Sequence, residues 1–386
     1  MKTTLFIVLL FSFGLTAFVT SRSIPMTSIK QYLQEQVNGG KSPSLQYIFF
    51  DTDSIIYEFH SGVKNVRTNT AVDSSTRYHV YSVTKTFTAL AVLQLAQDGK
   101  LALDKPAADY LPGFPYPKQI TVEQLLSHTS GIPNPLPLRW IHRVEEHKGF
   151  NRDEFFAEVF RKHSTLDFEP GTKFKYSNLG YVLLGQLIEK VSGQSFEDYV
   201  ETNIVDRSGV DRRELNFTLD TSVHAVGYQK WFSFYNAIFT FLIDKATFMG
   251  EREGGWKPFK PFYNNGVAYG GLFGTGPSLV KYAQALLKAN SVLLNDSYKE
   301  ILFREGVVNG QPTGMAHSWF TGVLKGNRYF AHAGGGGGYY VELRVYPNLG
   351  VGSVILFNRT GVSDERILDN IDKAFIAERE HAVAIR

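Results

Sequence analysis

The stretch from Tyr78 to Leu103 constrains the fold more than any other part of the chain. After Ser82, apolar residues recur at helical spacing, and Gly99 stands where such a helix would end. The other faces of this helix also carry alanine, valine and leucine, so it is apolar nearly all round. Because a helix of that kind has no face to turn toward water, we expect it in the middle of a domain.

Two polar residues at the start of this helix, Ser82 and Lys85, need an explanation of their own. Three positions apart on a helix, they lie on one face within reach of each other. A buried lysine loses proton affinity and can act as a base toward a serine hydroxyl, and free N–H groups at a helix start favour developing negative charge. The pair predicts a nucleophile and its activator in a helix that begins at Ser82. An N-cap serine followed by an ordinary surface lysine is the alternative, because S-x-x-K is a common pattern.

Composition narrows the possible functions. The 386 residues suffice for one large domain or two interleaved subdomains with a sizeable core. The 40 Lys and Arg residues nearly balance 37 Asp and Glu residues, and no basic run appears, so we expect no nucleic-acid partner. The absence of cysteine removes disulfides, thiolate nucleophiles and cysteine-ligated metals together.

Residues 1–21 read as a secretory signal peptide. Lys2 supplies a positive start, Leu5 to Val19 form an apolar run, and Val19, Thr20 and Ser21 offer small residues for cleavage. This pattern predicts export, to a periplasmic or secreted location. The alternative is an uncleaved anchor helix, although the apolar run is short for a bilayer span.

Patterns typical of strands lie near both ends of the chain. They cover Leu45–Phe50, Ile55–His60, Tyr339–Tyr346 and Val351–Phe357. The first two flank the turn 51–54 and the last two flank the turn 347–350, so each pair predicts a hairpin. A helix from Ser28 to near Gly39 precedes the first pair, and a helix from Asp364 to Glu378 follows the second.

Two further motifs combine polar groups with turns. Tyr176 and Asn178 stand in a loop before a helix predicted from Tyr181 to Val191. A packed aromatic and a helix cap would also explain them. His332 opens a glycine-rich run that reaches Gly338; the run lacks the phosphate-loop pattern, but glycine allows a ligand to approach backbone N–H groups closely.

Two other features have less specific interpretations. His128 follows a predicted helix in a turn-rich loop, where an imidazole commonly satisfies backbone groups, and we expect a structural role for it. Trp231 to Ile243 is dense in aromatic residues but too short to span a membrane. It could contact a membrane surface, line an apolar cleft, or form a core helix.

The motifs follow one another in a recognisable order. They are Ser82-x-x-Lys85, Tyr176-x-Asn178 and His332-Ala333-Gly334, and together they resemble the serine hydrolases of the β-lactamase and penicillin-binding-protein family, whose motifs line one cleft. The resemblance extends over nearly all of the chain after residue 21. The tyrosine motif is similar to the class C branch, which includes β-lactamases, D-alanyl-D-alanine carboxypeptidases, D-amino-acid peptidases and esterases. His332 stands where class C β-lactamases have lysine, and Ala333 replaces threonine, so the chain looks more like the carboxypeptidase and esterase members.

The resemblance implies a role for each motif residue. Ser82 would attack a carbonyl, while Lys85 and Tyr176 share the proton transfers. Asn178 would hold Lys85 or the substrate amide. The substrate side would be completed by His332, Gly334 and Gly335, with the N–H groups of Ser82 and Gly335 forming an oxyanion hole at the start of an edge strand. His332 would polarise the Tyr176 hydroxyl or meet the anionic end of the substrate. Water would then release the acyl group without a metal or organic cofactor.

The family also implies an architecture of the α+β class. We expect one β-lactamase/transpeptidase-like domain over residues 22–386. Residues 22–80 and 310–386 would form an antiparallel sheet flanked by the terminal helices, and residues 81–309 a mostly helical subdomain. The predicted function is an exported acyl-enzyme hydrolase of a small peptide, such as a D-Ala-D-Ala-like amide, or of an ester. A class C-like β-lactamase acting on a β-lactam and a non-catalytic penicillin-binding sensor are the alternatives.

Overall fold

A seven-stranded antiparallel sheet joins the two ends of the chain. The computed structural model describes residues 24–232, 244–362 and 366–384. The strand order is β13-β14-β15-β16-β1-β2-β3. The strands are β1 (Ser44–Asp51), β2 (Ile55–Asn65), β3 (Thr70–Ala71), β13 (Phe320–Leu324), β14 (Asn327–Gly336), β15 (Tyr339–Tyr346) and β16 (Val351–Phe357). Both predicted hairpins are confirmed, since β1 pairs with β2 and β15 pairs with β16.

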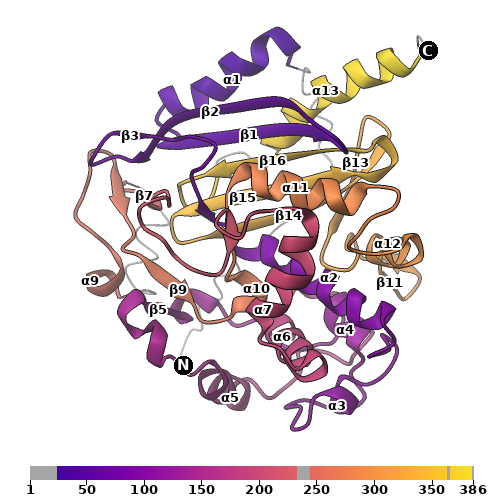
Figure 1. Ribbon diagram of the computed structural model, residues 1–386. Coiled ribbons are helices and arrows are strands. Elements are labelled where there is room, and N and C mark those ends of the chain that lie inside the picture. Colours follow the sequence, from indigo (N-terminus) through magenta and orange to yellow (C-terminus); the bar gives the residue numbers. More distant parts are fainter. Residues whose placement is uncertain (1–23, 233–243, 363–365, 385–386) are drawn as a thin grey trace, which may run out of the picture.

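The central strands of this sheet are covered on both faces. On one face, α1 (Met26–Asn38) and α13 (Ile367–Ala384) pack against β1 through a cluster that includes Leu33, Phe49 and Phe375. On the opposite face, Ile48 and Phe50 join the larger core beneath α11 (Gly276–Leu287). Figure 1 shows this layering, with α1 and α13 above the sheet and the remaining helices below it. The α+β architecture with flanking terminal helices is confirmed.

The apolar helix predicted in the middle of the domain is α2 (Thr84–Gln97). Every residue from Thr84 to Ala96 is buried, and the helix packs against α6 (Asn178–Ser192) and α10 (Val267–Gly270). It ends before Gly99, whose φ of +69° is a conformation that glycine adopts readily. The prediction that this helix begins at Ser82 is wrong: Tyr81–Val83 form a 3₁₀ turn, because Tyr81 has a φ of +46° and breaks the helical path.

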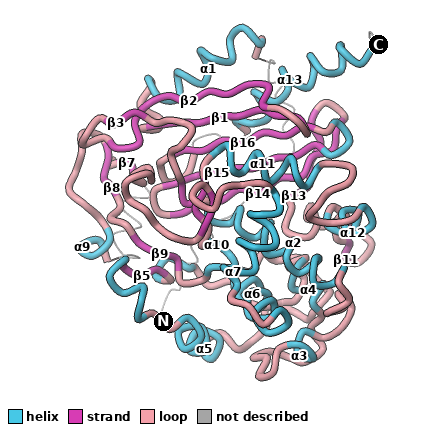
Figure 2. Tube along the Cα trace, in the orientation of Figure 1, coloured by secondary structure: helices cyan, strands magenta, loops and turns pink. Residues whose placement is uncertain are grey.

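The middle of the chain holds many short helices, with long loops and short strands between them, as Figure 2 shows. These helices are α3 (Ala107–Tyr110), α4 (Val122–Leu126), α5 (Arg152–Lys162), α7 (Phe196–Val200), α9 (Lys245–Phe248) and α12 (Asp296–Leu302). Between them lie short strands in small sheets: β4 (Tyr78–His79), β5 (Ile141–Arg143), β6 (Leu215–Asn216), β7 (Tyr228–Lys230), β8 (Trp256–Pro258), β9 (Phe262–Asn264), β10 (Phe273–Gly274), β11 (Val307–Val308) and β12 (Gln311–Pro312).

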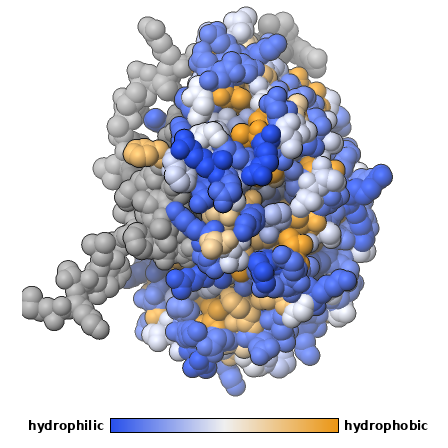
Figure 3. Space-filling view, turned by 90° about the vertical axis from the view of Figure 1, so that its left-hand side faces the viewer, coloured by the Kyte–Doolittle hydropathy of each residue, from blue (hydrophilic) through white to orange (hydrophobic). Residues whose placement is uncertain are grey.

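Two predictions fall outside the described residues. The signal peptide over residues 1–21 does so entirely, and the aromatic segment 231–243 does so beyond Phe232. In the ranges that the structure covers, no helix is both long and apolar enough to pass through a bilayer. Figure 3 shows apolar residues lying among hydrophilic ones on one face of the molecule.

Candidate active site

Ser82 lies in the turn that leads into α2, and the preceding residue fixes its position. A positive φ is uncommon for an aromatic residue and costs conformational free energy. Tyr81 adopts it with its hydroxyl donating to the carbonyl of Gly337 at 2.9 Å, in the turn after β14. The 3₁₀ turn is thereby attached to the edge of the main sheet, and Ser82 is partly exposed at the junction of sheet and helices.

Lys85 lies directly beside this serine. Its Nζ is 3.1 Å from Ser82 Oγ and donates to the carbonyl of Tyr269 at 2.8 Å. The rings of Tyr176, Tyr181 and Tyr269 surround the amine, with centroids 4.9, 5.7 and 5.2 Å away. Complete burial lowers the pKa of Lys85 well below its ordinary value, because desolvation disfavours the ammonium form. The lowered pKa favours the neutral amine, which is the form that can accept a proton from Ser82.

Tyr176 reaches the same place from the loop before α6. Its hydroxyl is 3.2 Å from Nε2 of His332. Burial raises the pKa of Tyr176, an effect partly offset by a hydrogen bond with the Ser82 hydroxyl. The phenol is consequently protonated at neutral pH and does not serve as a standing phenolate base.

His332 lies in β14 and is fully buried. Its Nδ1 contacts the carbonyl of Ser318, and its Nε2 contacts Tyr176. Burial, with the nearby charge of Lys85, lowers the pKa of His332 to about 3. Of the two roles expected for His332, the structure brings it to the Tyr176 hydroxyl, and a neutral imidazole has no charge to offer an anionic substrate group.

Asn178 is the first residue of α6, which begins three residues earlier than predicted. Ser177 caps this helix by accepting from the Gly180 N–H at 3.1 Å. Asn178 is thus free of the capping role considered from the sequence. Its side-chain oxygen is buried and has no hydrogen-bond partner among the described residues, although the residue lines the same cavity as Ser82. An unpaired acceptor at this place fits the N–H of a bound amide.

Gly334 allows β14 to pass very close to the nucleophile. A Cβ at Gly334 would lie 2.0 Å from the carbonyl oxygen of Val80 and 3.0 Å from the Ser82 nitrogen, so any side chain here would force β14 or the turn to shift. Gly335 lines the cavity beside Ser82. The prediction that Gly335 starts an edge strand is wrong: β14 runs from Asn327 to Gly336, because pairing with β15 continues through the glycines. The oxyanion hole itself stays a prediction.

The cavity at Ser82 has a volume of about 120 Å³ and is mainly apolar. Aromatic and aliphatic side chains form most of its walls, and its lining also includes two asparagines and three consecutive glycines. The lining residues are Tyr81, Ser82, Pro137, Ile141, Asn178, Phe259, Phe262, Asn264, Tyr269, Gly270, Gly335, Gly336 and Gly337. No charged residue occurs among the described residues of this lining.

The structural role expected of His128 is confirmed. Its Nδ1 accepts from the backbone N–H of Ser177 at 3.1 Å, and its ring stacks on Tyr176 with centroids 4.4 Å apart. Sequence reasoning missed the contributions of Tyr269 and Ser318, which act through backbone carbonyls.

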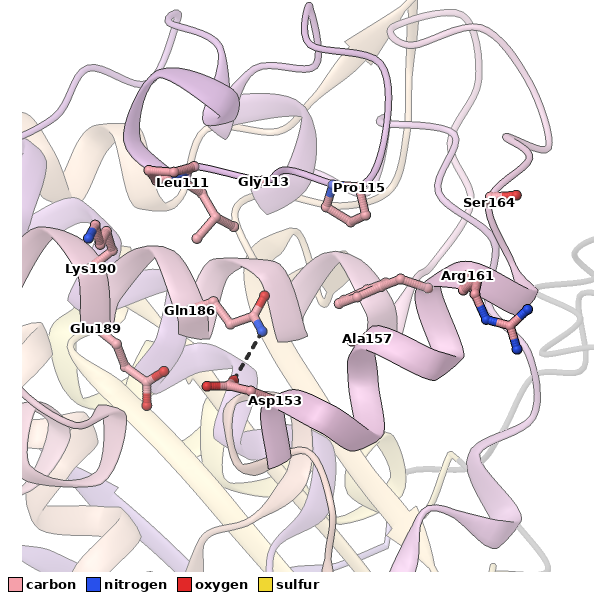
Figure 4. A pocket seen from close by; sticks show the side chains of 12 residues that line it. Leu111, Gly113, Pro115, Asp153, Ala157, Arg161, Ser164, Gln186, Glu189 and Lys190 are labelled. Carbon is pink, nitrogen blue, oxygen red and sulfur yellow. Dashed lines mark hydrogen bonds between the residues drawn. The ribbon is translucent and has the colours of Figure 1, made fainter. Parts of the chain in front are cut away.

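A larger cavity lies elsewhere. It has a volume of about 630 Å³ and is formed by the loop 111–115 with α5 and α6 (Figure 4). Gln186 donates to Asp153 across it at 3.3 Å. None of the predicted site residues lines this cavity, so size alone would have selected a place without the predicted chemistry.

Comparison with known proteins agrees with the motifs. The chain matches the β-lactamase family over residues 29–378. Protein flp of Staphylococcus aureus (strain N315) is 29% identical over 209 residues, which make up 52% of this chain and 41% of that protein, so the chain spans less than half of flp. Penicillin-binding protein 4 of Amycolatopsis lactamdurans is 27% identical over 329 residues, 81% of this chain and 79% of that protein.

Among solved structures, the fold is similar to D-amino acid amidase from Ochrobactrum anthropi SV3 complexed with L-phenylalanine amide. The TM-score is 0.71 at 19% sequence identity, covering 93% of this chain and 99% of that one. At this identity the likeness shows the fold alone. The sequence match over residues 29–378, in contrast, is evidence of family membership. With that match and the fold in agreement, the chain belongs to the β-lactamase family of serine hydrolases.

Proposed function

We propose that the protein is an exported serine hydrolase that cleaves a peptide amide or an ester through an acyl-enzyme. The observation that carries this proposal is that Lys85 and Tyr176 both contact Ser82, and Ser82 lines the apolar cavity. Lys85 Nζ is 3.1 Å from Ser82 Oγ, and the Tyr176 phenol contacts the same hydroxyl. A nucleophile with proton-exchanging groups at hydrogen-bond distance is the arrangement that covalent acyl transfer requires.

In the proposed reaction, Ser82 Oγ bonds to the substrate carbonyl carbon and gives its proton to the groups beside it. The carbonyl oxygen becomes an oxyanion, held by the N–H groups of Ser82 and Gly335. When the bond to the leaving amine or alcohol breaks, that group takes up a proton from the same side chains. A water molecule then attacks the acyl-enzyme by the reverse sequence and frees Ser82.

The cavity lining favours a substrate without a free carboxylate. The described lining of the site offers no arginine or lysine for a carboxylate, and His332 is neutral. The aromatic walls fit an apolar group next to the reacting carbonyl, and Asn178 fits an amide N–H. A simple amide or ester therefore suits this site better than a peptide or penicillin with a free carboxylate. The structural likeness to a D-amino acid amidase supports the amide as one substrate class.

A substrate panel tests the proposal. We would compare D-phenylalanine amide, p-nitrophenyl esters of graded length, a D-Ala-D-Ala peptide and nitrocefin. The expected result is turnover of the amide or ester that has no free carboxylate, lowered at least about 10³-fold in Ser82→Ala. A fluorophosphonate probe should label the wild type and leave Ser82→Ala unlabelled.

Ser164→Ala is the matched control, since Ser164 is an exposed serine that lines the larger cavity. It should keep full turnover and labelling. Equal labelling of the wild type and Ser82→Ala would contradict the proposal. Preferred turnover of nitrocefin would assign a class C-like β-lactamase instead. Stable penicillin labelling without turnover of any substrate would assign a non-catalytic sensor.

Export remains part of the proposal and rests on the pattern of residues 1–21. Periplasmic or secreted protein should begin near residue 22 when its N-terminus is sequenced after fractionation. Protein that stays in the cytoplasm with Met1 intact would contradict export.

We also propose that the region beginning at Trp231 touches a membrane surface. Phe232 is 94% exposed, and the cationic groups of Arg252 and Lys257 lie 5.3 and 5.7 Å from the Trp231 ring centroid. An aromatic group beside cations suits an anionic lipid surface. Phe232→Asp should weaken sedimentation with phosphatidylserine vesicles. Equal sedimentation of the variant and the wild type would contradict the proposed membrane contact.

A further inference from the structure

We propose that the backbone carbonyl of Ser318 sets the direction of a hydrogen-bond chain that runs from Lys85 through Ser82, Tyr176 and His332. This inference rests on the proposed function and adds a positioning residue to it. The starting point is the contact between His332 Nδ1 and the Ser318 carbonyl oxygen. A carbonyl oxygen can only accept a hydrogen bond, so Nδ1 must carry the imidazole proton.

The tautomer of His332 determines what Tyr176 can do. A neutral imidazole with its proton on Nδ1 has a bare Nε2, and that nitrogen lies 3.2 Å from the Tyr176 hydroxyl. Nε2 therefore accepts the phenol proton. With its proton turned toward His332, the Tyr176 oxygen has lone pairs left to accept from the Ser82 hydroxyl. Full burial of His332, away from water, keeps this neutral form.

The remaining contacts continue the chain in the same sense. Lys85 has one N–H engaged by the Tyr269 carbonyl and another directed at Ser82 Oγ. Each group thus donates to the next, from Lys85 to the Ser318 carbonyl. A lysine in place of His332, as in the class C β-lactamases that the motif resembles, would donate to Tyr176 and reverse this sense, because an ammonium cannot accept.

The backbone of Ser318 adopts an unusual conformation, which orients its carbonyl group. Its φ is +69°, it is fully buried, and its own hydroxyl is 3.4 Å from His332 Nδ1. A residue other than glycine adopts this left-handed conformation only at a cost in free energy. The chain turns here just before β13, and the turn presents the carbonyl to His332.

The direction of the chain gives the proton of Ser82 a path away from the reacting centre. As the bond from Ser82 Oγ to the carbonyl carbon forms, its proton moves to Tyr176, and the phenol proton moves to His332 Nε2. Lys85 donates to the serine oxygen throughout. When the bond to the leaving group breaks, the imidazolium returns its proton through Tyr176 to that group, so protons balance. The low proton affinity of a buried imidazole makes this return favourable.

Nitrogen-15 NMR on the full chain, labelled at its ten histidines, tests the tautomer directly. The His332 signals are assigned by their loss in His332→Gln. We expect a protonated Nδ1 and a bare Nε2 from pH 8 down to about pH 4, and the same tautomer in Tyr176→Phe, because the Ser318 carbonyl fixes it. A proton on Nε2, or an imidazolium at pH 7, would overturn the inference.

Kinetics on p-nitrophenyl butyrate form the second arm. His332→Lys should lower kcat by about 10² or more with little change in KM, since proton relays contribute about 10²- to 10⁴-fold. An alkaline limb should also appear, because the added cation lowers the pKa of the Tyr176 phenol. Ser318→Gly keeps the left-handed backbone available, whereas Ser318→Val disfavours it, so kcat should be about tenfold lower for valine than for glycine.

Equal kcat values for the two Ser318 variants, both correctly folded, would overturn the positioning role. The opposite tautomer together with Ser82-dependent ester turnover would refute the direction of the chain and leave the proposed function in place. Absence of Ser82-dependent turnover on the whole panel would refute the function, whatever the tautomer.

Discussion

The Lys85 side chain is enclosed by protein on all sides, and this links the chemistry of the site to the stability of the fold. Because burial lowers the pKa of Lys85, the unfolded chain binds more protons than the folded one between the folded and unfolded pKa values. Wild-type stability contributed by this group therefore rises with pH across that interval. Lys85→Met has a similar shape and no charge to desolvate.

We predict that Lys85→Met abolishes turnover yet unfolds at higher denaturant concentration than the wild type. Its advantage in free energy of unfolding should be largest at low pH and shrink by about 1.4 kcal/mol per pH unit across the interval. Urea titrations between pH 5 and 10 measure this, with the exposed Lys100→Met as control. A constant difference at all pH values would show that Lys85 keeps an ordinary pKa.

The amino-acid sequence predicts the side chains of the candidate site, but it does not predict the backbone groups that contribute to it. Ser82, Lys85 and Tyr176 belong to motifs in which only certain side chains can do the chemistry, so their identities were informative. Tyr269 and Ser318 contribute carbonyl oxygens that any residue type supplies, and no pattern of side chains can indicate them. The positive φ of Ser318 depends on tertiary packing and was likewise invisible.

Among the elements, β14 and the 3₁₀ turn before α2 form the tightest contact of the site. A Cβ on Gly334 would meet the Val80 carbonyl at 2.0 Å, whereas one on Gly335 would have its nearest neighbour, in the Tyr340 ring, at 3.8 Å. We predict that Gly334→Ala lowers the free energy of unfolding by about 1–3 kcal/mol, as overpacking typically does, while Gly335→Ala stays within about 0.5 kcal/mol. Thermal and urea unfolding check this, and equal losses would contradict it.

Sequence patterns predict the ends of the elements less accurately than the elements themselves. The hairpin of β15 and β16 was placed correctly, because alternating apolar residues flank a clear turn. The glycines of β14 have no side chains to alternate, so the strand end was mistaken for a strand start. The start of α2 was misplaced because the 3₁₀ turn at Ser82 leaves no mark in the apolar periodicity.

For the whole molecule, Asp372 connects α13 to the main sheet. Its carboxylate accepts from Tyr47 at 2.9 Å, Tyr346 at 2.9 Å and Ser353 at 2.7 Å, and it is fully buried. Burial raises the pKa of Asp372 to about 6 from an ordinary value of 3.8. The folded state consequently binds more protons than the unfolded state in this window, so the stability from this group falls as pH rises through it.

We predict that the free energy of unfolding of Asp372→Asn, relative to that of the wild type, rises by up to about 3 kcal/mol from pH 4 to pH 6. The wild type loses stability over this range as Asp372 ionises, whereas the asparagine does not titrate. Comparing urea midpoints at both pH values measures this. The exposed Asp104→Asn is the control and should follow the wild type. A pH-independent difference for Asp372→Asn would mean that the carboxyl ionises normally.

The pairing of β1 with β16 has a consequence for how the protein is made. Leu45 of β1 lies opposite Phe357 of β16. The first long strand to be synthesised therefore cannot pair with its central neighbour until nearly the whole chain has been made. Until then the apolar strand β1 stays exposed on the nascent chain, while α2, α6 and α10, which lie between β1 and β16 in the sequence, are already available to pack together. A premature stop before β16 would remove the strand that joins β15 to β1, and the turn that carries Ser82 would then face an incomplete sheet.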